Sequence, residues 1–259
     1  MIIDCHVHLP SPSLGVAVEW APFTPDVPSA IAYLKRCGVD KAICASFRAT
    51  EARSPEEMRA GNDETMEIAR TYPEMVIPGC CINPNFPEES VAELRRCHEL
   101  GIVWLHELVG YIGGYSYDTP GFAQTMAAAS ELGMVVQIHS EEPKAAEIDR
   151  LCGEFPKVPW VLAHIGDSRD ECHVRCELAA QRPNLYLDVC GHGIQRAGVL
   201  DLAVKWAGPE RVLFGSDYTV NDPAAVIATI QASYLEEGVK GKVLAGNVRR
   251  MLGERGVRV

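Results

Sequence analysis

Short apolar runs alternate with longer amphipathic stretches along the whole of this 259-residue chain, and the alternation repeats eight times. The runs are continuously apolar, as is typical of parallel strands that are covered on both faces. Eight strand–helix repeats predict an α/β protein with a (β/α)8 TIM barrel. The expected strands are 1–4, 41–46, 75–82, 102–106, 134–139, 160–164, 185–189 and 212–215. The expected helices are 29–37, 55–71, 88–100, 121–132, 144–152, 168–181, 195–206, 223–236 and 240–252.

The alternative arrangement of such repeats is a doubly wound open sheet. No G-x-G-x-x-G or P-loop glycine pattern follows the first strand, which counts against a nucleotide-binding sheet. A single barrel commonly reaches about 250 residues. We therefore expect one domain over residues 1–259, without linkers or internal repeats.

One connection is longer than a barrel needs. Residues 9–28 follow the first strand and contain five prolines, Pro10, Pro12, Pro22, Pro25 and Pro28. Long connections of this kind in compact domains are usually functional. We expect this segment to form a loop over the mouth of the barrel.

The charge balance excludes some classes of partner. Lys+Arg 24 against Asp+Glu 35 gives a formal net charge of -11, so phosphate-rich nucleic acids and anionic membranes would be repelled at long range. The apolar runs are shorter than the roughly 18 residues of a spanning helix, and no signal peptide is visible at Met1. The ten cysteines lack framework spacing, which favours reduced thiols and a cytoplasmic location.

Histidines gather at the expected carboxyl ends of strands, where barrel enzymes place their chemistry. Four of the eight histidines fall there, together with one aspartate: His6, His8, His139, His164 and Asp217. A buried group of unpaired imidazoles would be costly to desolvate, whereas mixed imidazole and carboxylate ligands suit a divalent metal. Alternation along the first strand also puts Asp4 on the face of His6 and His8, where it is expected to orient one imidazole.

The fourth strand offers one further ligand. His106 and Glu107 are adjacent, so strand alternation lets only one of them face a metal at the barrel end. We favour Glu107 as the ligand; the alternative is a solvated glutamate just past the strand.

These motifs resemble the amidohydrolase superfamily, and more closely its amidohydrolase-2 branch of metal-dependent barrels, over nearly the whole chain. The resemblance rests on Asp4-x-His6-x-His8, on 136–139 (VQIH), on 163–166 (AHIG), on 184–188 (NLYLD), on 213–218 (LFGSDY) and on 246–252 (GNVRRML). It implies that His6, His8, His139 and Asp217 are metal ligands, and that His164 binds a second metal or polarises the substrate. Many relatives carry a lysine on the fourth strand, which this chain lacks; Glu107 looks like the bridging glutamate of the TatD-like branch.

A divalent ion with open positions lowers the pKa of bound water towards about 7 and polarises a carbonyl oxygen. Asp217 could take the water proton and pass it to the leaving group, and His164 could steady the developing oxyanion. Zinc suits the imidazoles and is the expected metal, as one or two ions. Manganese becomes more competitive if Glu107 raises the share of carboxylates.

Three residues are candidates for binding substrate. Arg48 follows the second strand and could hold a carboxylate, with a surface or capping role as the alternative. Tyr111 belongs to a Gly-Tyr-rich stretch that supplies either aromatic contacts or a flexible loop. His192 lies beyond the seventh strand and could contact substrate or cap the next helix.

The main functional prediction is a metal-dependent hydrolase of a small-molecule amide, lactone or ester. The alternative is a metal-dependent non-oxidative decarboxylase or other lyase of a small carboxylic acid, in which a metal holds the substrate carboxylate. A TatD-like phosphodiesterase ranks lower because the chain is acidic, and a non-catalytic metal-binding protein ranks last. A small molecule is the expected partner, with no nucleic acid or membrane, and a homo-oligomer is left open.

Overall fold

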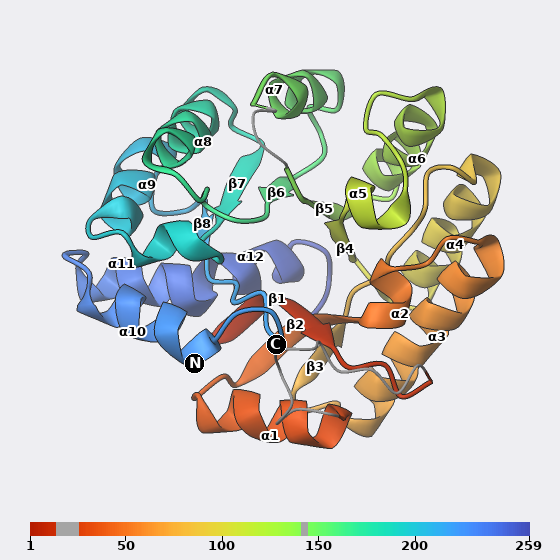
Figure 1. Cartoon of the computed structure of the whole chain (residues 1–259), viewed down its shortest axis with the longest axis horizontal. Helices are drawn as coiled ribbons and strands as arrows, with labels where there is room; N and C mark the ends of the chain where they lie inside the picture. The colour runs from red at the N-terminus through yellow and green to blue at the C-terminus, as the bar shows by residue number, and fades with distance from the viewer. Residues whose placement is uncertain (14–25, 141–144) are drawn as a thin grey trace.

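Eight parallel strands form the centre of the molecule, and the helices surround them, as expected for a TIM barrel (Figure 1). The computed structural model describes residues 1–13, 26–140 and 145–259, with only the backbone of residue 145. The strands are β1 (Ile3–Leu9), β2 (Lys41–Ser46), β3 (Val76–Pro78), β4 (Trp104–Leu108), β5 (Val135–Ile138), β6 (Trp160–Leu162), β7 (Leu185–Asp188) and β8 (Val212–Leu213).

Backbone hydrogen bonds close the strands into a ring. Strands β1 to β3 pair in parallel in chain order, and β4 to β8 do the same. The two sets are joined on one side where the amide of Cys80 donates to the carbonyl of Trp104 at 3.0 Å. They are joined on the other side where the amide of Cys5 donates to the carbonyl of Phe214, also at 3.0 Å. The predicted barrel is therefore confirmed, and no sheet edge is left open at these two junctions.

The long helices follow the strands in order and pack on the outside of the barrel. They are α1 (Val27–Arg36), α3 (Pro55–Thr71), α4 (Pro87–Glu99), α6 (Pro120–Glu131), α7 (Ala145–Glu154), α8 (Arg169–Gln181), α9 (Val199–Ala207) and α10 (Pro223–Ala232). The remaining helical segments are α2 (Phe47–Thr50), α5 (Gly110–Gly113), η1 (His192–Gln195), α11 (Glu237–Gly241), η2 (Lys242–Gly246) and α12 (Asn247–Gly253). Several begin at a proline behind a capping side chain; in α3 the Ser54 hydroxyl accepts from the amide of Glu57.

Some predicted boundaries are wrong. The first strand does not end at Asp4 but continues to Leu9, because His6 and His8 are buried and partnered inside the barrel. The helix predicted over 195–206 begins at Val199, since η1 ends at Gln195 and Gly198, in a left-handed conformation (φ 82°), precedes the first turn of α9. The helix predicted over 240–252 divides into three segments, and the start of the one predicted over 144–152 lies outside the described residues, as does 14–25 of the proline-rich loop.

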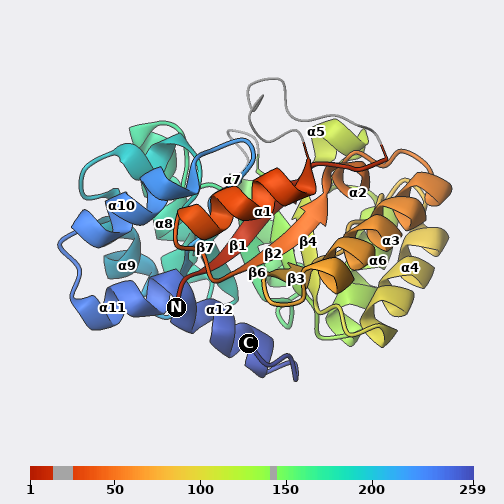
Figure 2. The same cartoon turned by 90° about the horizontal axis from the view of Figure 1, so that it is seen from below.

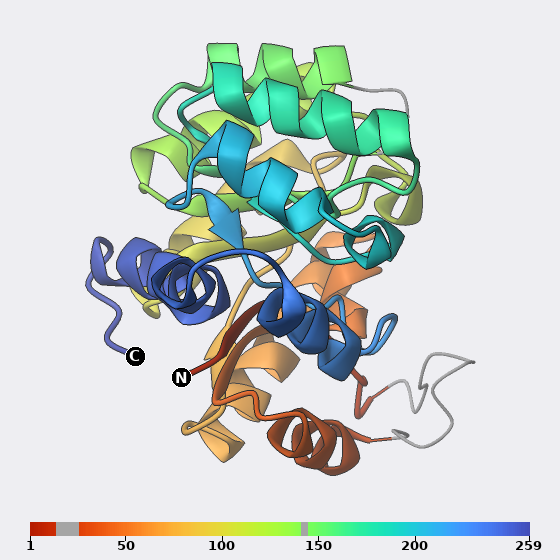
Figure 3. The ribbon, with the colours of Figure 1, turned by 90° about the vertical axis from the view of Figure 1, so that its left-hand side faces the viewer.

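The apolar core has two layers. The larger cluster lies between the strands and the surrounding helices. The smaller one fills the barrel interior with strand residues such as Ile3, Ile43 and Leu213, and Val248 and Leu252 of α12 pack against them. Figures 2 and 3 show both chain termini on the side of the barrel where β1 begins. Helix α12 thus covers the amino-terminal end of the barrel, and the opposite end is left for the histidines of β1.

None of the helices in the described part of the chain is both long and apolar enough to cross a membrane. All ten cysteines are free thiols, and nine of them are buried. Most therefore act as small apolar core residues, as the sequence indicates.

A buried polar network ties α3 to α4. Arg96 Nε donates to Glu93 Oε2 at 2.8 Å, and Asn62 Nδ2 donates to Glu93 Oε1 at 2.9 Å. The Asn62 side chain also accepts from the amide of Cys81, which follows β3. Burial opposes ionisation of Glu93, but the bonds from Arg96 and Asn62 outweigh it and hold the pKa of Glu93 below its ordinary value.

We expect Glu93→Gln to lower the free energy of unfolding by about 1–3 kcal/mol at pH 7, because the charge-assisted bond to Arg96 is lost. A carboxylate whose pKa is lower in the folded than in the unfolded chain stabilises the folded protein fully at pH values above the unfolded pKa of about 4.3. This stabilisation is lost as the pH falls through the pKa of the folded protein. The gap between variant and parent should therefore narrow below pH 4. Urea unfolding at pH 7, 5 and 3.5 measures it, with exposed Glu99→Gln on the same helix as control. A gap that stays constant with pH would contradict the assignment.

Candidate metal centre

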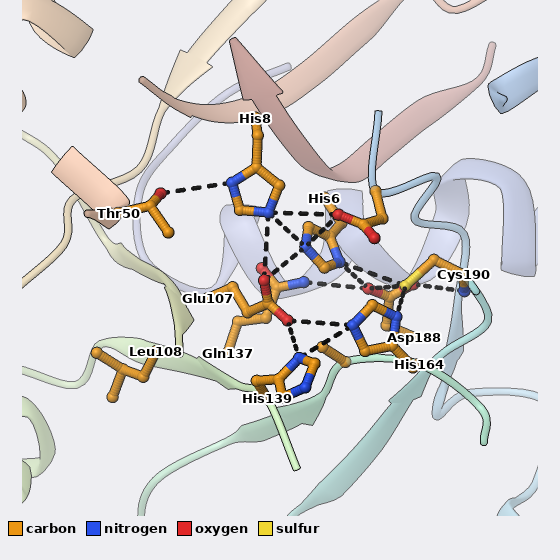
Figure 4. Close-up of polar contacts among 12 residues, drawn as sticks. His6, His8, Thr50, Glu107, Leu108, Gln137, His139, His164, Asp188 and Cys190 are labelled. Carbon is orange, nitrogen blue, oxygen red and sulfur yellow. Dashed lines mark hydrogen bonds and ion pairs between the residues drawn. The ribbon is translucent and has the colours of Figure 1, made fainter. Parts of the chain in front are cut away.

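Four side chains each place one donor atom around a common point at the carboxyl end of the barrel (Figure 4). His6 and His8 come from β1, Glu107 from β4 and Asp217 from the loop after β8. His8 Nε2 lies 3.1 Å from His6 Nε2 and 3.2 Å from Glu107 Oε2. Asp217 Oδ1 lies 3.5 Å from His6 Nε2 and 3.4 Å from His8 Nε2. We call these four residues the first donor group.

The second donor group consists of Glu107, His139 and His164. Glu107 Oε1 lies 2.9 Å from His139 Nδ1 and 3.3 Å from His164 Nε2. The two imidazole nitrogens are 3.1 Å apart. The two oxygens of Glu107 therefore face different groups, so this one carboxylate lies between them. His139 follows β5 and His164 follows β6, as expected from their positions in the sequence.

The spacing of these atoms suits a metal ion. Ligands about 2.1 Å from a tetrahedral ion stand about 3.4 Å from one another. The contacts within both groups run from 2.9 to 3.5 Å. The donors are imidazole nitrogens and carboxylate oxygens, which are ligands for divalent metals. The residues present therefore fit a divalent cation in each group.

The charges of the site also call for a cation. Burial disfavours the imidazolium of His6, yet the carboxylates of Glu107 and Asp217 outweigh burial and raise the pKa of His6 well above its usual range. Burial likewise opposes the carboxylate of Glu107, but His6 and His139 hold the pKa of Glu107 well below its usual range. Two buried carboxylates thus draw positive charge to this point, and a divalent ion meets the same demand without protonating its own ligands.

A hydrogen-bond chain fixes the orientation of His6. The indole of Trp104 can only donate, and its Nε1 donates to Gln137 Oε1 at 3.1 Å. The amide of Gln137 must therefore present its Nε2, which donates to Asp188 Oδ2 at 3.1 Å. His6 Nδ1 lies 2.7 Å from the same oxygen and donates to it. The neutral tautomer of His6 then has its lone pair on Nε2, toward the first donor group.

Backbone strain marks the two residues expected to do chemistry. His164 and Asp217 are the non-glycine residues with positive φ in the described chain, at 64° and 58°. Such conformations persist only where the surroundings impose them, and they cluster at functional sites. Buried Arg175 of α8 donates to the carbonyl of His164 and, at 2.8 Å, to that of Ser140. Asn221 Nδ2 donates to Asp217 Oδ2 at 2.9 Å and so orients that carboxylate.

His106 is placed differently from the expectation. Glu107 faces the donor groups, yet the buried ring of His106 also packs edge-on against His6 and His8, with ring centroids 5.5 and 5.0 Å away. The pairing of β4 with β5 shifts register between Leu105 and Leu108, so strict alternation does not hold there. Burial, and then the nearby imidazoles, lower the pKa of His106 well below its usual value.

The three expected substrate-binding residues lie at different places. Tyr111, on α5, is exposed, and its ring meets the edge of His139 with centroids 5.3 Å apart. Arg48, on α2, donates from Nη1 to Ser13 at 3.0 Å, next to the residues outside the described part. His192 begins η1 with its side chain three-quarters exposed, and its Nδ1 lies 3.7 Å from Asp167. Only Tyr111 among these has a ring contact with a member of the donor groups.

Asp4 does not orient an imidazole, so that prediction is wrong. Its Oδ1 accepts instead from the backbone amides of His6 and Ser216, which ties β1 to the end of β8. Burial raises the pKa of Asp4 to about 7. Asp188 orients His6 instead. No role was assigned to Asp188 from the sequence, although it ends β7 and the histidines were recognised by the same strand-end position.

Three further residues at the site were missed. Cys190 lies among His6, His164 and Asp188. Gln137 binds Asp188, and the hydroxyl of Thr50 lies 3.4 Å from His8 Nδ1. Gln137 and Cys190 lie near the carboxyl ends of strands, and that position could have identified them as site residues. For Thr50, on α2, the sequence offers no such indication.

The family of the chain follows from a match of a family model described as Amidohydrolase to residues 3–253. The chain belongs to this amidohydrolase-2 family of TIM-barrel proteins. None of the curated proteins matches the sequence significantly.

Solved structures share the fold from end to end. The 5-carboxyvanillate decarboxylase of Sphingomonas paucimobilis is 17% identical, with TM-score 0.78, covering 97% of this chain and 98% of its own. The dihydroxybenzoic acid decarboxylase of Polaromonas sp. JS666, solved with manganese and 2-nitroresorcinol, is 17% identical, with TM-score 0.74, covering 97% and 96%. An uncharacterized TIM-barrel protein of Bordetella bronchiseptica is 20% identical, with TM-score 0.77, covering 98% and 99%.

Gly215, two residues after β8, gives the Asp188 carboxylate its space. A Cβ added at Gly215 would lie 2.3 Å from Asp188 Oδ1. We expect Gly215→Ala to displace Asp188, leave His6 without its acceptor, and weaken divalent metal binding by about 10- to 100-fold. Competition with a chelator dye measures the affinity, and Gly253→Ala, which has open space around its Cβ, is the control. Equal affinity in Gly215→Ala and the parent would contradict this role for Asp188.

Proposed function

We propose that this protein is a metal-dependent non-oxidative decarboxylase of a small carboxylic acid. The observation that carries the proposal is that the fold resembles, over its whole length, that of decarboxylases whose names give small aromatic acids as substrates. It is supported by the two donor groups at the mouth of the barrel, where a small carboxylate can reach a metal. Between the two functions that the sequence left open, the comparisons favour the decarboxylase over the hydrolase.

Aromatic rings beside the donor groups support an aromatic acid as the substrate class. The ring of Phe47 stacks on His8 at 5.4 Å, and Tyr111 meets His139. A planar substrate ring could pack against such surfaces while its carboxylate faces the metal. Arg48 and His192 remain proposed contacts for the substrate, Arg48 through its guanidinium and a carboxylate.

His6, His8, Glu107 and Asp217 would hold one ion, and Glu107, His139 and His164 a second. The metal, when bound, supplies a Lewis acid that holds the substrate carboxylate and accepts negative charge. Zinc and manganese both suit this mixture of imidazoles and carboxylates. Manganese is the ion named in the Polaromonas decarboxylase.

Asp217 is the proposed proton carrier. In decarboxylation the bond between the substrate carbon and its carboxyl group breaks, carbon dioxide leaves, and the electron pair takes a proton. Asp217, a carboxylate in the resting site, would take a proton from solvent and deliver it to carbon. His164, in the second donor group, is 17% exposed. It would bind the second ion or, if only one ion is held, present a nitrogen toward the reacting molecule.

A hydrolase of an amide, lactone or ester is the second candidate, and Glu107 favours it. Its two oxygens face two donor groups, an arrangement that suits a pair of ions acting on one water. In this reaction Asp217 would take the proton of the water and pass it to the leaving group, and His164 would stabilise the oxyanion.

We expect the protein reconstituted with manganese or zinc to release carbon dioxide from hydroxybenzoates, and the metal-free protein to release none. A coupled carbon dioxide assay on a panel of hydroxylated and methoxylated benzoates, with metal counted by elemental analysis, tests this. A His6→Ala/His8→Ala double variant should lose both metal and turnover. Release of no carbon dioxide, with hydrolysis of aryl esters, lactones or amides by the two-metal form, would replace the decarboxylase with the hydrolase.

Asp217→Asn should keep the fold while turnover falls by several orders of magnitude, because the amide cannot carry the proton. Steady-state kinetics under saturating metal measures turnover, and circular dichroism checks the fold. Asn221→Ala removes only the orienting bond to Asp217 and should cost far less. Undiminished turnover in Asp217→Asn would exclude Asp217 as the proton carrier.

We further propose a cytoplasmic location, for which the ten free thiols are suited. The proposed partner is the small-molecule substrate.

A further inference from the structure

Cys190 lies in the interior of the site, fully buried, two residues after the end of β7. Its Sγ is 3.3 Å from Asp188 Oδ2, 3.1 Å from His164 Nδ1 and 3.4 Å from His6 Nδ1. No role for this thiol follows from the motifs in the sequence. Its position between a carboxylate and the outer nitrogen of a donor-group histidine is the starting point (Figure 4).

The direction of each hydrogen bond around Asp188 follows from Trp104, the group at which the series of hydrogen bonds begins. Trp104 can only donate, so Gln137 must donate to Asp188, and His6 Nδ1 donates to the same carboxylate oxygen. The other oxygen of Asp188 accepts from the backbone amide of Cys190 at 3.1 Å. Asp188 is thus surrounded by donors and is a pure acceptor, as an ionised carboxylate must be.

A thiol has one proton to give. The carboxylate of Asp188 is the charged acceptor within reach of Cys190 Sγ, and a charged acceptor forms the stronger bond. With its proton directed at Asp188, the sulfur has only lone pairs to offer His164. His164 Nδ1 must then carry a hydrogen and donate it to the sulfur, and its lone pair lies on Nε2, facing Glu107 and His139.

We infer that Cys190 is a positioning residue that relays the orientation of Asp188 to His164 and holds His164 in the tautomer able to bind a metal in the second donor group. Asp188 then sets both sides of the site, His6 directly and His164 through the sulfur. The inference rests on the proposed function, because it concerns the second ion. It also decides between the two roles open to His164, metal ligand and hydrogen-bond donor to substrate, in favour of the ligand.

The close packing around His164 agrees with a fixed ring. A Cβ at Gly191, which has φ +83°, would lie 3.1 Å from His164 Nδ1. The backbone of His164 is held at positive φ, with its carbonyl bound by Arg175. Among the described residues, the polar partner of His164 Nδ1 is Cys190 Sγ.

The first test reads the tautomer directly. In the full-length, metal-free protein labelled with ¹⁵N-histidine, the spectra are recorded at a pH alkaline enough to leave His164 neutral, with a single ring proton. Long-range ¹H–¹⁵N spectra then distinguish protonated from unprotonated ring nitrogens, and His164→Gln assigns the signals. We expect His164 to carry its proton on Nδ1, and Cys190→Ala to shift the tautomer balance. A parent spectrum with unprotonated Nδ1 in His164 would overturn the relay. This measurement needs neither metal nor activity.

The second test counts and titrates zinc. Cys190→Ala should bind the first zinc ion as the parent does and the second about 10- to 100-fold more weakly. Cys190→Ser, whose hydroxyl can donate to Asp188 and accept from His164, should restore binding to within a few-fold. Cys176→Ala, a buried thiol of α8, is the matched control and should change neither ion. Equal affinity of Cys190→Ala and the parent for the second ion would overturn the proposal.

The two tests separate the possible failures. A parent that binds no metal would sink the proposed function, while the spectra of His164 would still decide the relay. A parent that binds two ions with an unchanged Cys190→Ala would preserve the proposed function and remove Cys190 from it.

Discussion

The site depends on one electrostatic constraint: Glu107 and Asp217 are carboxylates almost fully buried in the end of the barrel. Burial of such groups is costly unless positive charge compensates them. Protonated His6, His8 and His164 can supply it, since the pKa of each is raised above its usual value, and a divalent cation supplies it without consuming the ligand lone pairs. The arrangement of His6, His8, His139 and His164 follows from this need.

A further shell of hydrogen bonds keeps these groups in place. Asp188 accepts from His6 and Gln137, and Gly215 leaves the room that its carboxylate occupies. Arg175 secures the strained turn after β6. The contacts of Asp188 with His6 and Gln137 are made between segments that are far apart in the sequence. The barrel is therefore more than a support, because its closure sets the tautomers and directions of the donor atoms.

The fold and the ligand set leave more than one chemistry open, since one superfold hosts many reactions. The proposed decarboxylation rests on similar barrels that bear the names of dihydroxybenzoate decarboxylases. The position of Glu107 between two donor groups keeps hydrolysis in view. Both reactions assign the same tasks to the chain: hold a cation, orient a small molecule, and move one proton through Asp217.

From the sequence alone, the alternation of strands and helices determined the barrel, and strand-end positions determined the six candidate ligands. These signals are local, because a strand's carboxyl end needs only its own residues to be recognised. The tertiary structure decided which side chains contact one another at the site. Asp188 rather than Asp4 orients His6, the register shift in β4 brings His106 against the site, and Cys190 reaches His164. Such contacts depend on side-chain distances across the closed barrel, and no sequence spacing encodes them.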